Sequence, residues 1–188
     1  MLRTCRTCAG KSLRHARRLS TPSAAAVAPH ELLLARTYLR STGKELAPGL
    51  DERTVFGGDA QAAAVRAHEL LWSADFILLS HGTQPSPVMA YGNQAAMDLF
   101  ETSWEALAGL ESRYTAPPDC MEDREGLLRR VSEFGFIDDY GGTRVTSMGR
   151  RFTIDNVTVW EVFCPDSGVR LGQAATFKRP PPEPPVDP

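Results

Sequence analysis

The spacing of hydrophobic residues along this chain changes near residue 135. Before this point apolar residues recur every three or four positions, as in amphipathic helices, and after it they alternate with polar residues, as in strands. Two earlier apolar runs, 76–79 and 88–91, are long enough for strands and too short for helices. The predicted helices are 31–40, 59–72, 94–100, 102–108 and 119–134. The predicted strands are 76–79, 88–91, 136–140 continued by 143–146 after a bend or bulge at Gly141-Gly142, 151–163 and 169–177.

The order of these elements predicts an α+β fold. Two strands precede the long helix 119–134 and three follow it, which predicts one five-stranded antiparallel sheet with helices on one face, plus N-terminal helices. The run Phe76-Ile77-Leu78-Leu79 has no polar position, so we expect this strand to be covered on both faces or to line a cavity. The predicted divisions of the chain are a leader at 1–28, an N-terminal helical region at 29–73, a core at 74–178 and a Pro-rich tail at 179–188.

The two ends of the chain differ in composition from the middle. Residues 1–28 contain six basic residues, no acidic residue and several Ser and Thr, which is typical of an organelle transit peptide. We therefore predict a location in the mitochondrion or chloroplast, with a cytoplasmic protein that has a basic tail as the alternative. Residues 179–188 contain six prolines and cannot form a core element, so we predict a disordered tail.

The distribution of charged residues along the chain indicates which kinds of partner it can bind. Six of the 21 basic residues and none of the 23 acidic residues lie in residues 1–29, so the rest of the 188-residue chain has 15 basic and 23 acidic residues, a net charge of −8. Because phosphate contacts need concentrated positive charge, we predict no nucleic-acid partner. No run reaches the roughly 18–20 apolar residues that cross a bilayer, so we predict no membrane partner either.

Several short sequence blocks occur in the order that is characteristic of one known family. They are Leu79-Ser80-His81-Gly82, Tyr91-Gly92-Asn93-Gln94-Ala95-Ala96, Leu99-Phe100-Glu101-x-Ser103-Trp104, Gly135-Phe136-Ile137-Asp138-Asp139-Tyr140, Gly149-Arg150-Arg151-Phe152, Thr158-Val159-Trp160 and Gly172-Gln173-Ala174-Ala175. Together they resemble the MEKHLA domain, a PAS-like family, over residues 31–177. The family includes small stand-alone proteins and the C-terminal part of plant class III homeodomain-leucine zipper regulators, and this chain resembles the stand-alone type.

The resemblance implies a module that binds a small ligand or a partner chain. It leaves the cofactor open, and two familiar PAS cofactors fit poorly. Ser112 stands where a flavin photosensor of the LOV type has its adduct-forming Cys, and a hydroxyl cannot form that thioether. The predicted helix 119–134 contains no His to ligate haem, and His30, His68 and His81 are too scattered for a metal site.

Five residues are candidates for binding a ligand. His81 follows the first predicted strand, where it either lies at a pocket mouth or satisfies backbone groups of a loop. Asn93 either caps the next helix or contacts a ligand. Trp160 and Gln173 lie on predicted strands that would form the floor of a PAS pocket, and Tyr140 closes one of the family blocks.

The sequence is compatible with three functions. The first is a small-ligand sensing or signalling module without enzymatic activity, which a pocket of about 300 Å³ or more would favour. The second is a ligand-free module that forms a homodimer, which exposed apolar surface on 31–40 would favour. The third is a small cavity-based enzyme, which we do not favour because Asp138 and Asp139, as neighbours on a strand, would face opposite ways.

Overall fold

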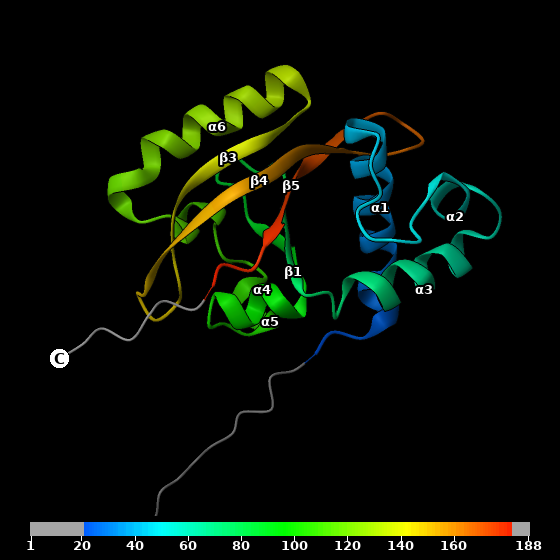
Figure 1. Cartoon of the computed structure of the whole chain (residues 1–188), viewed down its shortest axis with the longest axis horizontal. Helices are drawn as coiled ribbons and strands as arrows, with labels where there is room; N and C mark the ends of the chain where they lie inside the picture. The colour runs from blue at the N-terminus through cyan, green and yellow to red at the C-terminus, as the bar shows by residue number, and fades with distance from the viewer. Residues whose placement is uncertain (1–20, 182–188) are drawn as a thin grey trace, which may run out of the picture.

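A five-stranded antiparallel sheet forms the centre of the molecule (Figure 1). The computed structural model describes residues 21–181, apart from the side chains of residues 121–125 and 128. The strand order is β2-β1-β5-β4-β3, so all five predicted strands are confirmed as members of one sheet. The strands are β1 (Phe76–His81), β2 (Met89–Gly92), β3 (Phe136–Val145), β4 (Arg151–Phe163) and β5 (Arg170–Lys178).

One face of the sheet, here called the inner face, packs against the helices that lie between β2 and β3 in sequence. Its apolar side chains form one core cluster with side chains of these helices, which confirms the predicted α+β arrangement with helices on one face. The helices are α4 (Gln94–Leu99), α5 (Trp104–Leu107), the 3₁₀ turns η1 (Ser112–Thr115) and η2 (Pro118–Cys120), and α6 (Met121–Phe134).

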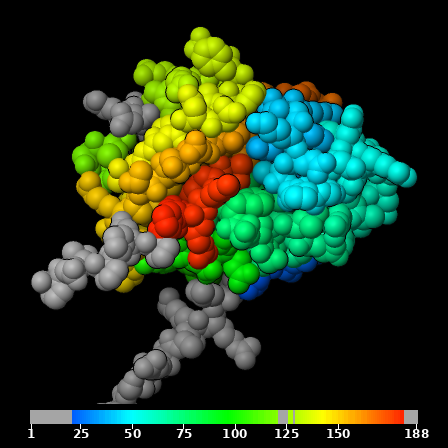
Figure 2. Space-filling model, in the orientation of Figure 1, coloured from blue at the N-terminus to red at the C-terminus, as the bar shows by residue number. Residues whose placement is uncertain are grey.

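The opposite face, here called the outer face, is covered by the N-terminal helices α1 (Ala24–Thr42), α2 (Glu52–Phe56) and α3 (Ala60–Leu71). In Figure 2 the N-terminal helices, coloured cyan and teal, form a block at the right of the view, beside the sheet. β1 is therefore covered on both faces, as its uninterrupted apolar sequence predicts, because Ile77 faces α4 and Leu78 faces the N-terminal helices.

The first helix is longer than its sequence pattern predicts. α1 begins at Ala24, and Val27 and Ala28 are buried, so the predicted boundary between leader and helical region at residue 28 falls inside this helix. The rest of the predicted transit peptide, residues 1–20, and the predicted tail at 182–188 lie outside the described residues.

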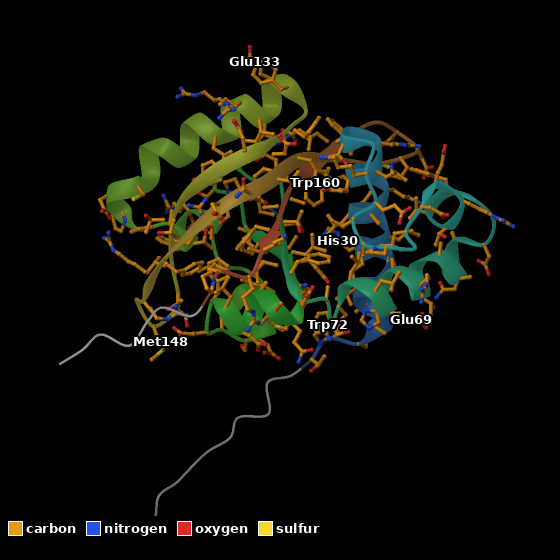
Figure 3. The ribbon with its side chains drawn as sticks, in the orientation of Figure 1. His30, Glu69, Trp72, Glu133, Met148 and Trp160 are labelled. Carbon is orange, nitrogen blue, oxygen red and sulfur yellow. The ribbon has the colours of Figure 1, made fainter. Side chains whose placement is uncertain are left out.

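Trp160 of β4 anchors α1 to the outer face. Its side chain is completely buried, its indole N–H donates to Thr37 Oγ1 at 3.0 Å, and the Tyr38 ring meets it edge-on at 5.0 Å between centroids. In Figure 3 Trp160 and His30 lie between the sheet and α1, whereas Met148 lies at the periphery. Trp160 therefore supplies both apolar area and a directed hydrogen bond at this interface.

A buried carboxylate makes the second link between the N-terminal helices and the sheet. Glu31 of α1 is completely buried, and its two oxygens accept hydrogen bonds from the Tyr91 hydroxyl of β2 and from His68 Nδ1 of α3, the latter at 2.8 Å. Burial, with the adjacent Glu31 charge, raises the pKa of the Tyr91 phenol well above its ordinary value, so Tyr91 remains a hydrogen-bond donor. Glu31 thus joins two helices and one strand.

The pairing of β3 with β4 is irregular in two places. Asp138 and Asp139 fall between the pairs Ile137–Val159 and Tyr140–Val157, where β3 has one extra residue. The next irregularity is in β4 at Asn156, whose φ of 48° is unusual for a residue other than glycine. Such bulges change which side chains of a strand point to each face. Asn156 therefore confirms the interruption that the sequence indicates in this strand.

We expect Trp160→Ala to lower the free energy of unfolding by about 3–5 kcal/mol, because it leaves a large cavity between β4 and α1. Trp160→Phe keeps a ring and loses the bond to Thr37, so its cost should be smaller, about 1–2 kcal/mol. Urea denaturation followed by circular dichroism measures both values. An unfolding midpoint of Trp160→Ala equal to that of the wild type would show that the indole does not anchor α1.

His30 should make stability dependent on pH. Its Nε2 lies 2.8 Å from Ser80 Oγ, and burial lowers the pKa of its imidazole from the ordinary value of 6.5. The unfolded chain therefore binds a proton below about pH 6.5 that the folded protein resists, so this contribution to stability is lost as the pH falls through that range. We expect the stability advantage of the wild type over His30→Gln to shrink between pH 7 and pH 5, measured by denaturant unfolding, whereas a constant difference would contradict this assignment.

Candidate functional site

A cavity of about 80 Å³ lies between the inner face of the sheet and the helices that cover it. Much of its wall is apolar and comes from strands β1, β2, β4 and β5 and from α6. Representative apolar residues of the wall are Leu79, Met89, Leu127, Ile154, Val159 and Phe177. The cavity is therefore part of the inner core.

Polar side chains from four elements also line this cavity. Apart from Ser80, which also lines the cavity but whose hydroxyl bonds His30 of α1, they are His81 of β1, Ser112 and Thr115 of η1, Tyr140 and Arg144 of β3, and Gln173 of β5. A small apolar cavity with several convergent polar groups is the usual form of a ligand site. We call these six residues the polar lining.

The size of the cavity limits its occupant. An engineered apolar cavity of about 150 Å³ holds benzene, and sites for drug-sized ligands start near 300 Å³. The volume of about 80 Å³ does not reach the 300 Å³ expected for the sensor hypothesis. It suits a molecule of about four to six non-hydrogen atoms or a few waters.

Arg144 and Tyr140 form a pair on β3. Arg144 is 8% exposed, its Nη2 donates to the Tyr140 hydroxyl at 3.0 Å, and its Nη1 donates to the Thr143 carbonyl at 2.8 Å. The guanidinium carbon also lies 5.2 Å from the centre of the Tyr140 ring, within reach of a cation–π interaction. These contacts hold the guanidinium in the wall of the cavity.

Gln173 belongs to a network that extends away from the cavity. Its Nε2 donates to Glu161 at 2.8 Å, and this buried carboxylate also accepts bonds from Ser132 of α6 and from Arg170. Arg170 neutralises the Glu161 charge in an ion pair. The side chain of Gln173 is therefore oriented by groups outside the cavity.

Of the five predicted ligand-binding residues, three meet at this cavity. His81, Tyr140 and Gln173 line it together, from β1, β3 and β5. His81 ends β1 instead of lying in a turn, and its Nδ1–H donates to the Gly82 carbonyl at 2.9 Å. His81 thus bonds loop backbone and also faces the candidate site.

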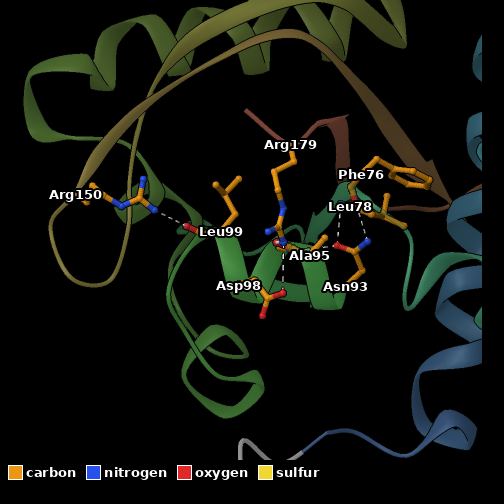
Figure 4. A network of polar contacts seen from close by, with 9 residues as sticks. Phe76, Leu78, Asn93, Ala95, Asp98, Leu99, Arg150 and Arg179 are labelled. Atoms are coloured by element: carbon orange, nitrogen blue, oxygen red, sulfur yellow. Dashed lines mark hydrogen bonds and ion pairs between the residues drawn. The ribbon is translucent and has the colours of Figure 1, made fainter. Parts of the chain in front are cut away.

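Asn93 is a structural cap and does not line the cavity. Its Oδ1 accepts from the N–H groups of Leu78 and Ala96, both at 3.1 Å, and its Nδ2 donates to the carbonyls of Leu71 and Phe76 (Figure 4). The side chain is completely buried, and these four bonds use its hydrogen-bonding groups. The cap interpretation of Asn93 is confirmed, and its placement in a ligand site is corrected.

Trp160 also lies outside the cavity, on the outer face. If β4 alternated without interruption, Trp160 would share a face with Ile154, which lines the cavity. The extra residue at Asn156 reverses the alternation, so Val157 and Val159 line the cavity and Trp160 points to α1. The predicted role of Trp160 in the pocket floor is therefore corrected to an anchor for α1.

Arg144 and Thr115 were not predicted as site residues. An Arg on a strand is usually solvated, so nothing in the local sequence indicates that Arg144 is buried beside Ser112 and Thr115 in the cavity wall. Ser112, which stands at the position of the adduct-forming Cys of LOV-type photosensors, is buried and lines the cavity.

Asp138 and Asp139 lie away from the cavity. Asp138 and Asp139 are both exposed and pair separately with Lys44 and Arg130. Lys44 follows α1 and Arg130 belongs to α6, so the two carboxylates reach elements on opposite faces of the sheet, as expected for neighbours on a strand. The described side chains include no group of three or more His, Cys, Asp or Glu that could hold a metal. Within the same residues no helix is long and apolar enough to span a membrane.

The fold matches that of a solved PAS domain. The PAS domain of a protein from Colwellia psychrerythraea is similar with a TM-score of 0.52 and 10% sequence identity, over 61% of this chain and 94% of that chain. This chain has the five-stranded antiparallel sheet, with helices between β2 and β3, that is expected for this class. The fold and its cavity therefore define a PAS-like domain, with additional N-terminal helices on the outer face.

Within this class the chain belongs to the MEKHLA domain family, whose model matches residues 28–180. It is 32% identical over 150 residues to the homeobox-leucine zipper protein ATHB-14 and 30% identical over 132 residues to ATHB-9, both from Arabidopsis thaliana. These alignments cover 76% and 69% of this chain, and 16% and 15% of the relatives. The chain thus spans about a sixth of the length of the curated relatives it matches.

The cap assignment of Asn93 makes a quantitative prediction. Asn93→Ala leaves buried backbone groups of β1, α4 and the end of α3 without partners, so it should cost about 2–4 kcal/mol of unfolding free energy. Ser103→Ala is the matched control, because Ser103 caps α5 through one bond to Ala106, and it should cost about 1 kcal/mol. Equal costs in urea unfolding would contradict a bridging role for Asn93.

Proposed function

We propose that this protein is a non-enzymatic signalling module that responds to a small molecule in its inner cavity. The observation that carries the proposal is the convergence of polar side chains from β1, η1, β3 and β5 on a space between the sheet and its helices. Membership of a PAS-like family agrees with this function. Among the described lining residues no carboxylate accompanies His81 to form an acid–base pair, which supports a binding role over an enzymatic one.

The strands provide a physical route from the cavity to the N-terminal helices. On each of the three central strands, a residue that lines the cavity is followed by one that contacts α1 or packs in the outer core. Val159 is followed by Trp160, Gln173 by Ala174, and Leu79 by Ser80, which bonds His30. A shift of the strands on ligand binding would therefore change the packing of α1.

The surface of residues 31–40, on which the dimer hypothesis depends, gives that hypothesis little support. Within 31–40, α1 exposes no large apolar side chain, because it is covered by the sheet and α3. Exposed apolar side chains do occur where β4 connects to β5, at Phe163, Val169 and Leu171. We propose docking of a second copy at this surface as the secondary function, because three exposed apolar side chains lie together in sequence there. Location in an organelle remains a separate proposal that rests on the composition of residues 1–28.

The binding proposal can be tested with a panel of neutral and charged solutes of about four to six non-hydrogen atoms. We expect at least one to bind and to shift NMR signals of the cavity methyl groups and of α1. Ala175→Leu places additional carbons in the cavity wall and should abolish these shifts while the protein remains folded. Val169→Ala, on the exposed surface, is the matched control and should bind normally. The absence of binding by the whole panel, or equal binding by Ala175→Leu, would contradict the proposal.

A further inference from the structure

Arg144 differs from the other buried charged residues of the molecule. Glu31 is bonded to Tyr91 and His68, and Glu161 is paired with Arg170. Arg144 is 8% exposed, yet its acceptors among the described residues are neutral: the Thr143 carbonyl and the Tyr140 hydroxyl. No carboxylate among the described residues lies within ion-pair distance of its guanidinium.

A buried guanidinium cannot avoid the free-energy cost of burying a charge by losing its proton, because arginine stays charged in proteins. Burial of a charge without a counter-charge is strongly unfavourable. The bonds to Thr143 and Tyr140 use two of the five N–H donors of Arg144. Three donors therefore have no acceptor among the described residues, and the side chain lines the cavity.

The composition of the wall narrows the chemical class of the occupant. Among the described lining residues there is no Asp, Glu or Lys, so Arg144 supplies the permanent charge of the site. One cation matches one negative group, and a guanidinium binds a carboxylate through two parallel hydrogen bonds. The apolar part of the wall, from residues such as Leu79, Val159 and Phe177, suits a short hydrocarbon body. The volume of about 80 Å³ limits the whole ligand to about four to six non-hydrogen atoms.

We infer that the cavity binds a short-chain aliphatic monocarboxylate, with the carboxylate on the Arg144 guanidinium and the hydrocarbon against the apolar wall. This inference rests on the proposed function, since it names the ligand class for the same cavity. Arg144 is the residue that selects anions, and Tyr140 positions it. A dicarboxylate is excluded by charge, because the described wall offers no second cation.

The test compares two molecules of the same shape that differ in charge. Isobutyrate and isobutyramide are titrated separately into the full chain at pH 7.5 and matched ionic strength, and binding is followed through methyl signals of the cavity by NMR. We expect isobutyrate to bind about tenfold or more tightly than isobutyramide, as expected for a charge-assisted bond in place of a neutral one. Arg144→Met should remove this preference and leave the affinity for isobutyramide within about twofold, because the change removes charge and keeps an apolar chain of similar length.

Two further variants serve as controls for Arg144→Met. Arg144→Lys retains the charge and should retain part of the preference for isobutyrate, which also covers the case that Arg144→Met does not fold. Arg130→Met, which removes an exposed arginine paired with Asp139, is the matched control and should keep the full preference.

Equal affinity of the wild type for both molecules would overturn the anion assignment while leaving the cavity as a binding site. An undiminished preference in folded Arg144→Met would overturn the role of Arg144. If neither molecule binds but another solute of the panel does, the monocarboxylate class is wrong and the proposed function stands. If no solute binds, both fail.

Discussion

The burial of both faces of the sheet is the constraint on which the rest of this structure depends. α4–α6 cover the inner face and α1–α3 cover the outer face, so consecutive residues of a central strand enter two different cores. Every polar group on these strands must therefore find a partner within the protein, because water does not reach it freely. Trp160 and Thr37, His30 and Ser80, and Glu31 and Tyr91 meet this requirement across the outer face.

The requirement that buried polar groups have partners also underlies the function that we propose for the inner face. Glu161 is compensated by Arg170, Ser132 and Gln173, whereas Arg144 has neutral partners and faces a cavity. A fold that neutralises its other buried charges provides, at this one described position, a site for an external anion. Because the cavity wall and the α1 interface share the same strands, an occupant and the N-terminal helices act on the same structural element. This arrangement is what a PAS-like MEKHLA domain would need to convert binding into a change at its surface.

The sequence predicts the sheet well because the pattern of its strands is local. The run 76–79 indicates a strand with two covered faces, and the alternation of 151–163 matches β4. The positions of single side chains are less predictable, since they depend on register. One extra residue at Asn156 moves Trp160 from the cavity to α1, and the bulge at Asp138-Asp139 exposes both carboxylates. Arg144 has no local signal, because its burial in the cavity wall depends on residues distant in sequence, whereas His81, Tyr140 and Gln173 could be found from the family blocks.

Hydrogen exchange of the native protein, measured amide by amide in increasing denaturant, tests most directly whether the two-sided sheet is one cooperative unit. We expect amides in the buried part of α1, from Leu32 to Tyr38, to exchange through the same global opening as those of β1, β4 and β5. Exposing the outer face also breaks the bonds to Glu31 and Trp160. Exchange of α1 through a separate opening of much lower free energy, with the strands still protected, would contradict it.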